Sequence, residues 1–335
     1  MKDDEYFLSF IKKSPEISEK TKNIYLRYID NIQKEIWPRC HSKHKCDDNK
    51  CCLAYILKHP QAFTDKLNDY CDNTKGRQGE KLGNHTRDIY MSSMMALFLR
   101  NQTLRTKHYE LYQKWKEMHE MIRKPIDTKY KSNEPTQRQK EGYLTYDEII
   151  KIAQSLPKGS QERLLFMMYT EIPPVRSDYV QTRIFTKESE ANKCPGNYII
   201  LTKKNPKLIL NKYKTAKTYK TLTIDIPSSL FREIKESLKE KPRDYLFVSS
   251  RTGEPFEEAN TFNKWANRTL KKITNKPKFS ISMLRHIFIT RRDLKLEEKS
   301  GLEQEKIAKL MGHSIEQQRR YLWHSWIKKE ESNIH

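Results

Sequence analysis

The stretch Ser282-Met283-Leu284-Arg285-His286-Ile287-Phe288-Ile289-Thr290 sets an arginine and a histidine inside an apolar run. Two other islands in the same half of the chain mix polar and apolar residues in a similar way. They are Pro173-Pro174-Val175-Arg176-Ser177-Asp178-Tyr179 and Leu310-Met311-Gly312-His313, and Tyr321 lies eight residues beyond the histidine. None of the three looks like ordinary packing, so they mark the residues where chemistry is expected.

The segments around these islands predict a domain that is mainly α-helical with a small antiparallel β-sheet. Thr145-x-x-Glu148 is a capping-box signature ahead of an apolar run. Residues 164–169 predict a helix that ends before Pro173, and the helical pattern returns beyond Pro227. Three strand-like runs with short connections predict an antiparallel meander between these helices: residues 197–202, 207–210 and 221–226.

The first third of the chain predicts a separate helical domain. Ser18 precedes a run in which Ile24, Tyr28 and Ile32 share one helical face, and further helices are expected from Asn84 and over roughly 106–123. Proline, asparagine, glycine and basic residues then interrupt the pattern, as is typical of a linker. We therefore expect three parts: a helical N-terminal domain over 1–123, a basic linker over 124–142, and a second domain with a C-terminal tail over 143–335.

The charge of the chain favours a polyanionic partner. Its 335 residues include 65 Lys and Arg against 43 Asp and Glu, which gives a formal net charge of +22. The excess is spread along most of the sequence instead of forming one basic tail. Nucleic acid is the commonest polyanion that a protein of this charge meets, although a merely soluble basic protein is the alternative.

The sequence predicts an intracellular protein. It has no run of about 18 apolar residues that would span a membrane, and Met1 to Glu5 are too acidic for a signal peptide. In a reducing compartment the six cysteines are expected to be free thiols. Cys40, Cys46, Cys51 and Cys52 cluster with His41 and His44 and could hold zinc. Their spacing departs from paired C-x2-C motifs, so a polar loop with free thiols is the favoured alternative, and no metal or cofactor is expected.

The three islands together resemble the tyrosine recombinase (phage integrase) family. Residues 284–290 look like its L-R-H-x-x-x-T box, and Met311-Gly312-His313-Ser314 looks like its L-G-H-S box with the tyrosine close behind. The 173–179 island and Tyr213-Lys214-Thr215-Ala216-Lys217 are similar to recombinases of large DNA viruses and their mobile elements. The resemblance covers about residues 144–325 and implies a mixed α/β catalytic domain, with the N-terminal domain binding DNA.

The resemblance assigns roles that suit the chemistry of a phosphodiester. Arg176 and Arg285 would clamp the non-bridging oxygens, because guanidinium groups are permanently charged and offer forked donors. Tyr321 would attack the phosphorus and form a 3′-phosphotyrosyl bond, so rejoining needs neither ATP nor metal. His313 would donate to a phosphate oxygen from a turn where Gly312 ends one helix and Ser314 caps the next.

The leaving 5′-oxygen needs a proton, which the family takes from a lysine in the β-hairpin. Lys214 fits this role best, with Lys217 and Lys220 as open alternatives. The remaining lysines of the hairpin are expected only to grip phosphate: Lys203, Lys204, Lys207 and Lys212.

Three residues depart from the family pattern or support it in a secondary way. The family usually has a histidine three residues before its second arginine, where this chain has Ser282. That role is left vacant, taken by water, or borrowed by His286, whose expected task is to brace the fold. Asp178 follows Arg176 by two residues where an acidic residue three after is usual, and we expect it to orient Arg176 through a carboxylate–guanidinium pair.

The interpretation is a site-specific recombinase or integrase that acts on double-stranded DNA as a tetramer and exchanges strands through a Holliday junction. It would work wherever the DNA of its element lies, in the host nucleus, cytoplasm or viral factory. Two alternatives stay open: a type IB topoisomerase that relaxes DNA, and a DNA-binding protein whose catalytic centre has decayed. The tail with Trp323, Trp326 and Ile327 is expected either to dock on a neighbouring subunit or to close its own domain.

Overall fold

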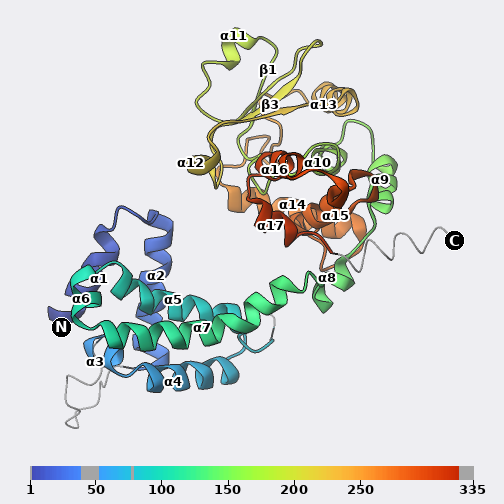
Figure 1. Ribbon diagram of the computed structural model, residues 1–335. Helices are drawn as coiled ribbons and strands as arrows, with labels where there is room; N and C mark the ends of the chain where they lie inside the picture. Colours follow the sequence, from blue (N-terminus) through green and yellow to red (C-terminus); the bar gives the residue numbers. More distant parts are fainter. Residues whose placement is uncertain (1, 39–52, 77–78, 324–335) are drawn as a thin grey trace. The chain divides into compact units, whose positions relative to one another are not determined.

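The chain divides into two compact units, Met1–Ser132 (unit 1) and Asn133–His335 (unit 2). The computed structural model describes residues 2–38, 53–76 and 79–323 (Figure 1). Within these residues no helix is long and apolar enough to cross a membrane. The cysteine and histidine cluster of residues 40–52 lies outside the described residues, apart from which Cys71 and Cys194 are free thiols.

Unit 1 is a bundle of helices in which α5 packs against α2 and α7. Ser18 caps α2, because its side chain accepts a hydrogen bond from the backbone N–H of Thr21. The core contains Trp115 of α7, fully buried, whose indole N–H donates to the carbonyl of Leu57 over 2.8 Å. The elements are α1 (Lys2–Lys13), α2 (Glu19–Asn31), the π-helical turn η1 (Ile32–Ile36), α3 (Leu53–Lys58), α4 (Pro60–Asn73), α5 (Asn84–Leu99), α6 (Gln102–Lys107) and α7 (Tyr109–Lys131).

The segment predicted as an irregular linker over 124–142 is largely helical instead. Helix α7 continues through Pro125 to Lys131, and α8 (Gln137–Gly142) follows after a short turn. Pro125 is exposed, whereas Ile126 beside it is buried and lies one turn after the partly buried Ile122. The apolar face of α7 therefore outweighs the hydrogen bond that a proline costs in a helix.

Unit 2 combines helices with a small sheet, which confirms the predicted fold class (Figure 1). Helix α10 packs against α9, α13 and α15, and α14 packs against α15. After α8 the helices are α9 (Tyr146–Ser155), α10 (Gln161–Thr170), α11 (Glu188–Ala191), α12 (Ala216–Tyr219), α13 (Ser228–Glu240), α14 (Ala259–Thr274), α15 (Ile281–Thr290), the 3-10 turns η3 (Arg292–Leu294) and η4 (Leu296–Glu298), α16 (Gly301–Leu310) and α17 (Ile315–Arg319).

The sheet has four strands in the order β1-β2-β3-β4. The predicted meander is present, with β2 antiparallel to β3 and β3 antiparallel to β4. The sequence prediction missed β1, which adds to β2 in parallel and makes the sheet mixed. Alternation along β2 sends Ile199 into the main core of the unit, and Tyr198 and Ile200 into a small cluster on the other face. The strands are β1 (Arg183–Phe185), β2 (Tyr198–Ile200), β3 (Lys207–Leu210) and β4 (Leu222–Asp225).

Candidate active site

The three islands meet inside unit 2, although they lie far apart in the sequence. The first, residues 173–179, is the loop that follows α10. Arg285 sits on α15, and Gly312 and His313 form the turn between α16 and α17. Tyr321 lies two residues beyond the end of α17 instead of two turns along a longer helix.

Arg285 is the group that ties the islands together. Its side chain is 1% exposed. One Nη donates to the carbonyl of Pro174, and the other donates to the carbonyl of Met311 over 3.3 Å and to Nδ1 of His313 over 3.4 Å. Its Nε is buried and finds no acceptor among the described residues. The α15 arginine therefore holds both neighbouring islands and still has a donor to offer.

His313 is fixed in one neutral form by this contact. Since Arg285 can only donate, Nδ1 of His313 must accept, and the ring proton lies on Nε2. Burial, and after it the positive charges of Arg285 and Arg176, together lower the pKa of His313 to about 3. Nε2 is buried without a partner among the described residues. His313 thus presents an unused N–H donor beside two guanidinium groups.

Arg176 reaches the same turn from the other side. Its Nη1 donates to the carbonyl of Gly312 over 3.2 Å, and its side chain is only partly buried. Burial lowers the pKa of Arg176, the nearby Arg285 lowers it too, and negative charge on Tyr321 would raise it. Two guanidinium groups that repel each other are best stabilised by an anion between them.

Asp178 holds the backbone of its loop and does not pair with the Arg176 guanidinium as predicted. Its Oδ2 accepts a hydrogen bond of 3.2 Å from the backbone N–H of Arg176, and the carboxylate also accepts from the backbone N–H of Lys214. Burial raises the pKa of Asp178, while Arg176 and these N–H groups oppose that rise. The carboxylate joins the first island to the hairpin connection.

The ring of Tyr321 lies among the groups of the site. The centroid-to-centroid distance to His313 is 5.3 Å, and the guanidinium carbon of Arg285 is 5.0 Å from the Tyr321 ring centroid. The backbone carbonyl of Tyr321 accepts from Nδ1 of His286 over 2.9 Å and from the hydroxyl of Thr290 over 3.5 Å. His286 and Thr290 are one turn apart on α15, which explains the R-H-x-x-x-T spacing.

His286 is buried in unit 2, and its expected role as a brace of the fold stays a prediction. Its ring stacks on Trp323 with centroids 3.8 Å apart and planes 13° apart. Burial lowers its pKa to about 3, and the Tyr321 carbonyl opposes that shift. Trp323 is buried and also approaches Tyr143, so this part of the tail packs on its own unit. Trp326 and Ile327 lie outside the described residues.

Ser282 lies on the exposed side of α15. It lines a cavity of 210 Å³ together with Lys271, Lys278 and His286. Its hydroxyl makes no hydrogen bond to any residue that the structure describes, and a serine hydroxyl does not act as a base near neutral pH. Which group takes the place of the missing histidine stays a prediction.

The hairpin connection between β3 and β4 is docked onto the Gly-His turn. Thr215 donates from its hydroxyl to the carbonyl of Gly312 over 2.9 Å. Gly312 has φ +67°, a left-handed backbone that glycine adopts without strain, and a Cβ there would lie 3.3 Å from Oγ1 of Thr215. Lys214 and Lys217 flank this contact with exposed side chains. The side chain of Lys220 is exposed too, so Lys214 stays the favoured prediction, with Lys217 and Lys220 as alternatives.

Sequence reasoning missed the residues that hold the site together. Tyr169 donates from its hydroxyl to the carbonyl of Arg176. Asn197 donates to the carbonyl of Asp178 over 2.8 Å and accepts from the backbone N–H of Lys212 over 2.8 Å. A tyrosine inside an apolar helix and an asparagine at the start of a strand give no signal of such contacts. Thr290 is the exception, because its spacing from Arg285 in the sequence indicated that it lies at the site.

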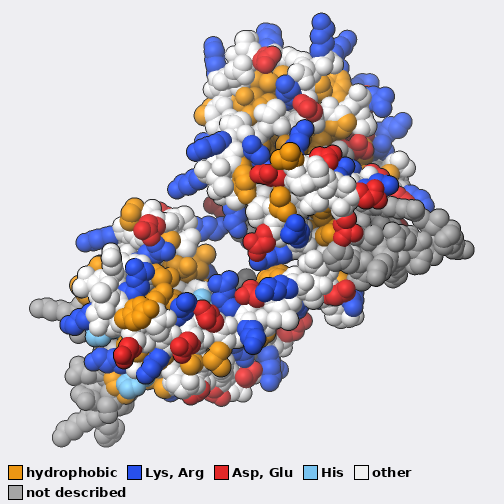
Figure 2. All heavy atoms as spheres, viewed as in Figure 1, with side chains coloured by type: hydrophobic (Ala, Val, Ile, Leu, Met, Phe, Trp, Pro, Cys, Tyr) orange, Lys and Arg blue, Asp and Glu red, His pale blue; other side chains and the backbone are white. Residues whose placement is uncertain are grey.

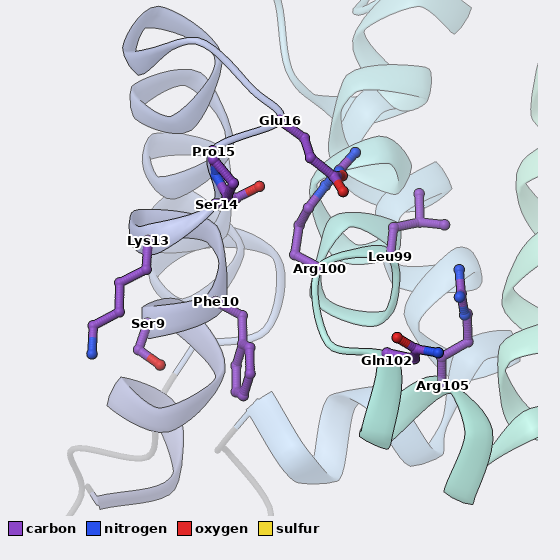
Figure 3. Close-up of a pocket in the computed structure, with 10 residues that line it drawn as sticks. All are labelled: Ser9, Phe10, Lys13, Ser14, Pro15, Glu16, Leu99, Arg100, Gln102 and Arg105. Carbon is purple, nitrogen blue, oxygen red and sulfur yellow. The ribbon is translucent and has the colours of Figure 1, made fainter.

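A larger cavity of 710 Å³ lies in unit 1, between α1 and the turn that joins α5 to α6 (Figure 3). Arg100 forms an ion pair with Glu16 there, and the side chains of the two residues point toward each other. None of the three islands contributes to it. Among the described residues no cluster of histidine, cysteine or carboxylate side chains could hold a metal ion.

No protein-family profile matches the chain, and no curated protein sequence does either. Among solved structures, the chain is similar to that of XerA recombinase, at 14% identity and a TM-score of 0.41, over 99% of both chains. It is also similar to XerH site-specific recombinase bound to its difH substrate in a pre-cleavage complex. That match has 15% identity and a TM-score of 0.38, over 95% of this chain and 97% of the other.

Proposed function

We propose that this protein is a site-specific DNA recombinase of the tyrosine type, in which Tyr321 is the nucleophile. The observation that carries the proposal is the buried Nε2–H of His313, which has no acceptor among the described residues and lies beside Arg285 and Arg176. A buried donor without a partner costs about 1–3 kcal/mol. A phosphate oxygen would accept from it and would balance the two guanidinium charges.

The reaction uses each of these groups at a stated atom. The phenolic oxygen of Tyr321 attacks the phosphorus and releases its proton to water, the bond to the 5′-oxygen breaks, and a 3′-phosphotyrosyl bond forms. The two arginines and His313 stabilise the charge that builds on the non-bridging oxygens. Lys214 gives a proton to the leaving 5′-oxygen. The reverse attack by a 5′-hydroxyl of another strand rejoins the DNA.

The charge of the chain supports DNA as the substrate. Lys and Arg side chains are spread over the faces of both units that Figure 2 shows, in keeping with the net charge of +22. Phosphate contacts of this kind weaken steeply with salt. Four copies would act on two duplexes and exchange strands through a Holliday junction.

Capture of the covalent intermediate tests the proposal. Sheared DNA from the genome that carries the gene is incubated with the protein, denatured with SDS, and searched for protein-bound fragments by sequencing. We expect adducts at one sequence with the wild type and none with Tyr321→Phe. The free end should be a 5′-hydroxyl, which polynucleotide kinase labels without prior phosphatase treatment. A wild type that yields no adduct contradicts the proposal and favours the decayed DNA-binding protein.

The captured sequence then separates recombination from relaxation. Two copies placed on one plasmid should give deletion or inversion products with the wild type. Adducts accompanied by relaxation of supercoiled plasmid, without recombinant product, would instead point to the topoisomerase alternative.

A further inference from the structure

A line of three hydrogen bonds runs from the start of unit 2 to the backbone of Tyr321. The backbone N–H of Thr136 donates to Oε1 of Gln139 over 2.8 Å, within the capping box of α8. Nε2 of Gln139 is 3.5 Å from Nε2 of His286. Nδ1 of His286 is 2.9 Å from the carbonyl oxygen of Tyr321.

The direction of every bond in this line is fixed by its two ends. A backbone N–H can only donate, so the amide of Gln139 turns its oxygen to Thr136 and its NH2 group to the ring. The ring nitrogen that faces this NH2 group is Nε2, and it must accept through its lone pair. The proton of His286 therefore lies on Nδ1. A carbonyl oxygen can only accept, and the carbonyl of Tyr321 faces that proton. Both ends therefore demand the same tautomer.

The imidazole is also held in place by its surroundings. It is 9% exposed and stacks on Trp323. The charged and titratable groups that face it are Arg285 and Tyr321 on one side, and Arg138, Lys271 and Lys278 around the cavity it lines on the other. No carboxylate is among them, so nothing in this set stabilises a second ring proton.

We propose that Gln139 is a positioning residue, which locks His286 as the Nδ1–H tautomer and through it holds the backbone that carries Tyr321. The inference rests on the proposed function, since it takes Tyr321 as the nucleophile. If the lock is lost, the Nδ1 lone pair can turn toward the Tyr321 carbonyl, and the two repel. The carbonyl of Tyr321 then loses its shorter hydrogen bond and keeps the 3.5 Å contact from Thr290, while its N–H still donates to the carbonyl of Gln318 over 2.8 Å.

The variant Gln139→Glu reverses the polarity of the line without removing the helix cap. Glutamate also closes a capping box, so α8 is expected to fold. Its carboxylate accepts from His286, which favours a proton on Nε2 or a doubly protonated ring, and therefore raises the pKa of His286. Gln137→Glu is the matched control, because Gln137 is exposed on the same helix and gives the same change of charge.

Nitrogen-15 NMR of histidine-labelled protein reads the tautomer without any DNA. We expect His286 as Nδ1–H in the wild type and in Gln137→Glu, and a shift to Nε2–H in Gln139→Glu at pH 8. Adduct formation on the captured site should be at least fivefold slower in Gln139→Glu at pH 8. It should recover toward pH 6, where a doubly protonated ring again donates to Tyr321.

Three results would overturn the inference. One is a wild-type His286 protonated on Nε2, and another is a tautomer that Gln139→Glu leaves unchanged. The third is a changed tautomer with adduct formation equal to that of Gln137→Glu. A wild type that forms no adduct at all overturns the proposed function and the positioning of a nucleophile with it, while the NMR result still decides whether Gln139 sets the tautomer.

Discussion

The hydroxyl of Thr215 donates a hydrogen bond of 2.9 Å to the carbonyl oxygen of Gly312. This contact attaches the lysine-bearing connection between β3 and β4 to the turn that presents His313. Nη1 of Arg176 donates to the same oxygen, so one carbonyl serves two partners from different parts of the chain. The position of the hairpin lysines relative to the turn depends on this oxygen.

Replacing Thr215 with valine tests that dependence. Valine has nearly the same shape but no hydroxyl, so the hairpin connection loses its hydrogen bond while Arg176 still satisfies the carbonyl. We expect adduct formation to slow about tenfold and the free energy of unfolding to fall by about 1 kcal/mol. Thr218→Val, at an exposed position of α12, is the control. Equal rates for the two variants would contradict a positioning role for Thr215.

The proposed role of a hairpin lysine as the acid for the leaving oxygen is tested by changing the leaving group. A substrate with sulfur at the 5′-bridging position expels a thiolate, which needs no proton. We expect Lys214→Ala to slow cleavage of ordinary DNA at least a hundredfold and to cleave the sulfur substrate at nearly the wild-type rate. Lys217→Ala and Lys220→Ala should be slowed on neither substrate. Selective rescue of one of those two variants would transfer the role to it.

Changing each of the two arginines to lysine is expected to lower the free energy of unfolding by a different amount. Both changes remove a forked donor, so adduct formation should fall at least a hundredfold in each. Arg285→Lys also leaves the carbonyls of Pro174 and Met311 short of donors in a buried setting, at a cost of about 2 kcal/mol in the free energy of unfolding. Arg176→Lys should cost less than about 1 kcal/mol, because Thr215 still donates to Gly312. Urea unfolding measures the difference, and equal costs would contradict it.

Acid should destabilise the protein through its two buried histidines. The pKa of His286 and of His313 is about 3 in the folded chain, against an ordinary value near 6.5. The unfolded state therefore binds more protons below pH 6.5, and the free energy of unfolding falls by up to about 1.4 kcal/mol per pH unit for each histidine.

Urea unfolding at pH 7, 6 and 5 tests this pH dependence. His313→Gln should flatten it by about half. A wild-type stability that does not vary over this range would refute the buried, neutral state of both rings.

Ser282 is expected to take no part in the chemistry. Its side chain is exposed and makes no hydrogen bond within the part of the chain that the structure describes. Ser282→Ala should therefore change the rate of adduct formation less than twofold and the free energy of unfolding by less than about 0.5 kcal/mol. A tenfold loss of rate would show that the hydroxyl has taken over the missing histidine's task.

Local sequence signals predicted an element well where the element depends on residues that are close together in the chain. The Thr145 capping box, the Ser314 cap before Gln317, and the strands around Ile199, Leu208 and Ile224 all form as expected. Each depends on residues that are neighbours in the chain or on plain alternation. The same holds for Gly312, which ends α16 in a left-handed conformation.

The contacts that the sequence did not predict are those that depend on tertiary packing. The local composition predicted a helix break at Pro125. Helix α7 continues through it, because a face one turn long on α7 is buried. Asp178 was predicted to pair with a guanidinium, but its carboxylate accepts hydrogen bonds from two backbone N–H groups instead. Gln139 carried no signal at all, because its partner is 147 residues away in the chain.

Helix α8 opens unit 2, Trp323 lies at the last described position of it, and both touch the imidazole of His286. Among the described residues of unit 2, the first helix and the last residue thus share one small ring, which closes this part of the unit on itself. Local opening should then be cooperative at these two places, so that amides of α8 and of residues 321–323 exchange with solvent deuterium at a common rate. A fragment trimmed to begin at residue 143 would lack half of that closure.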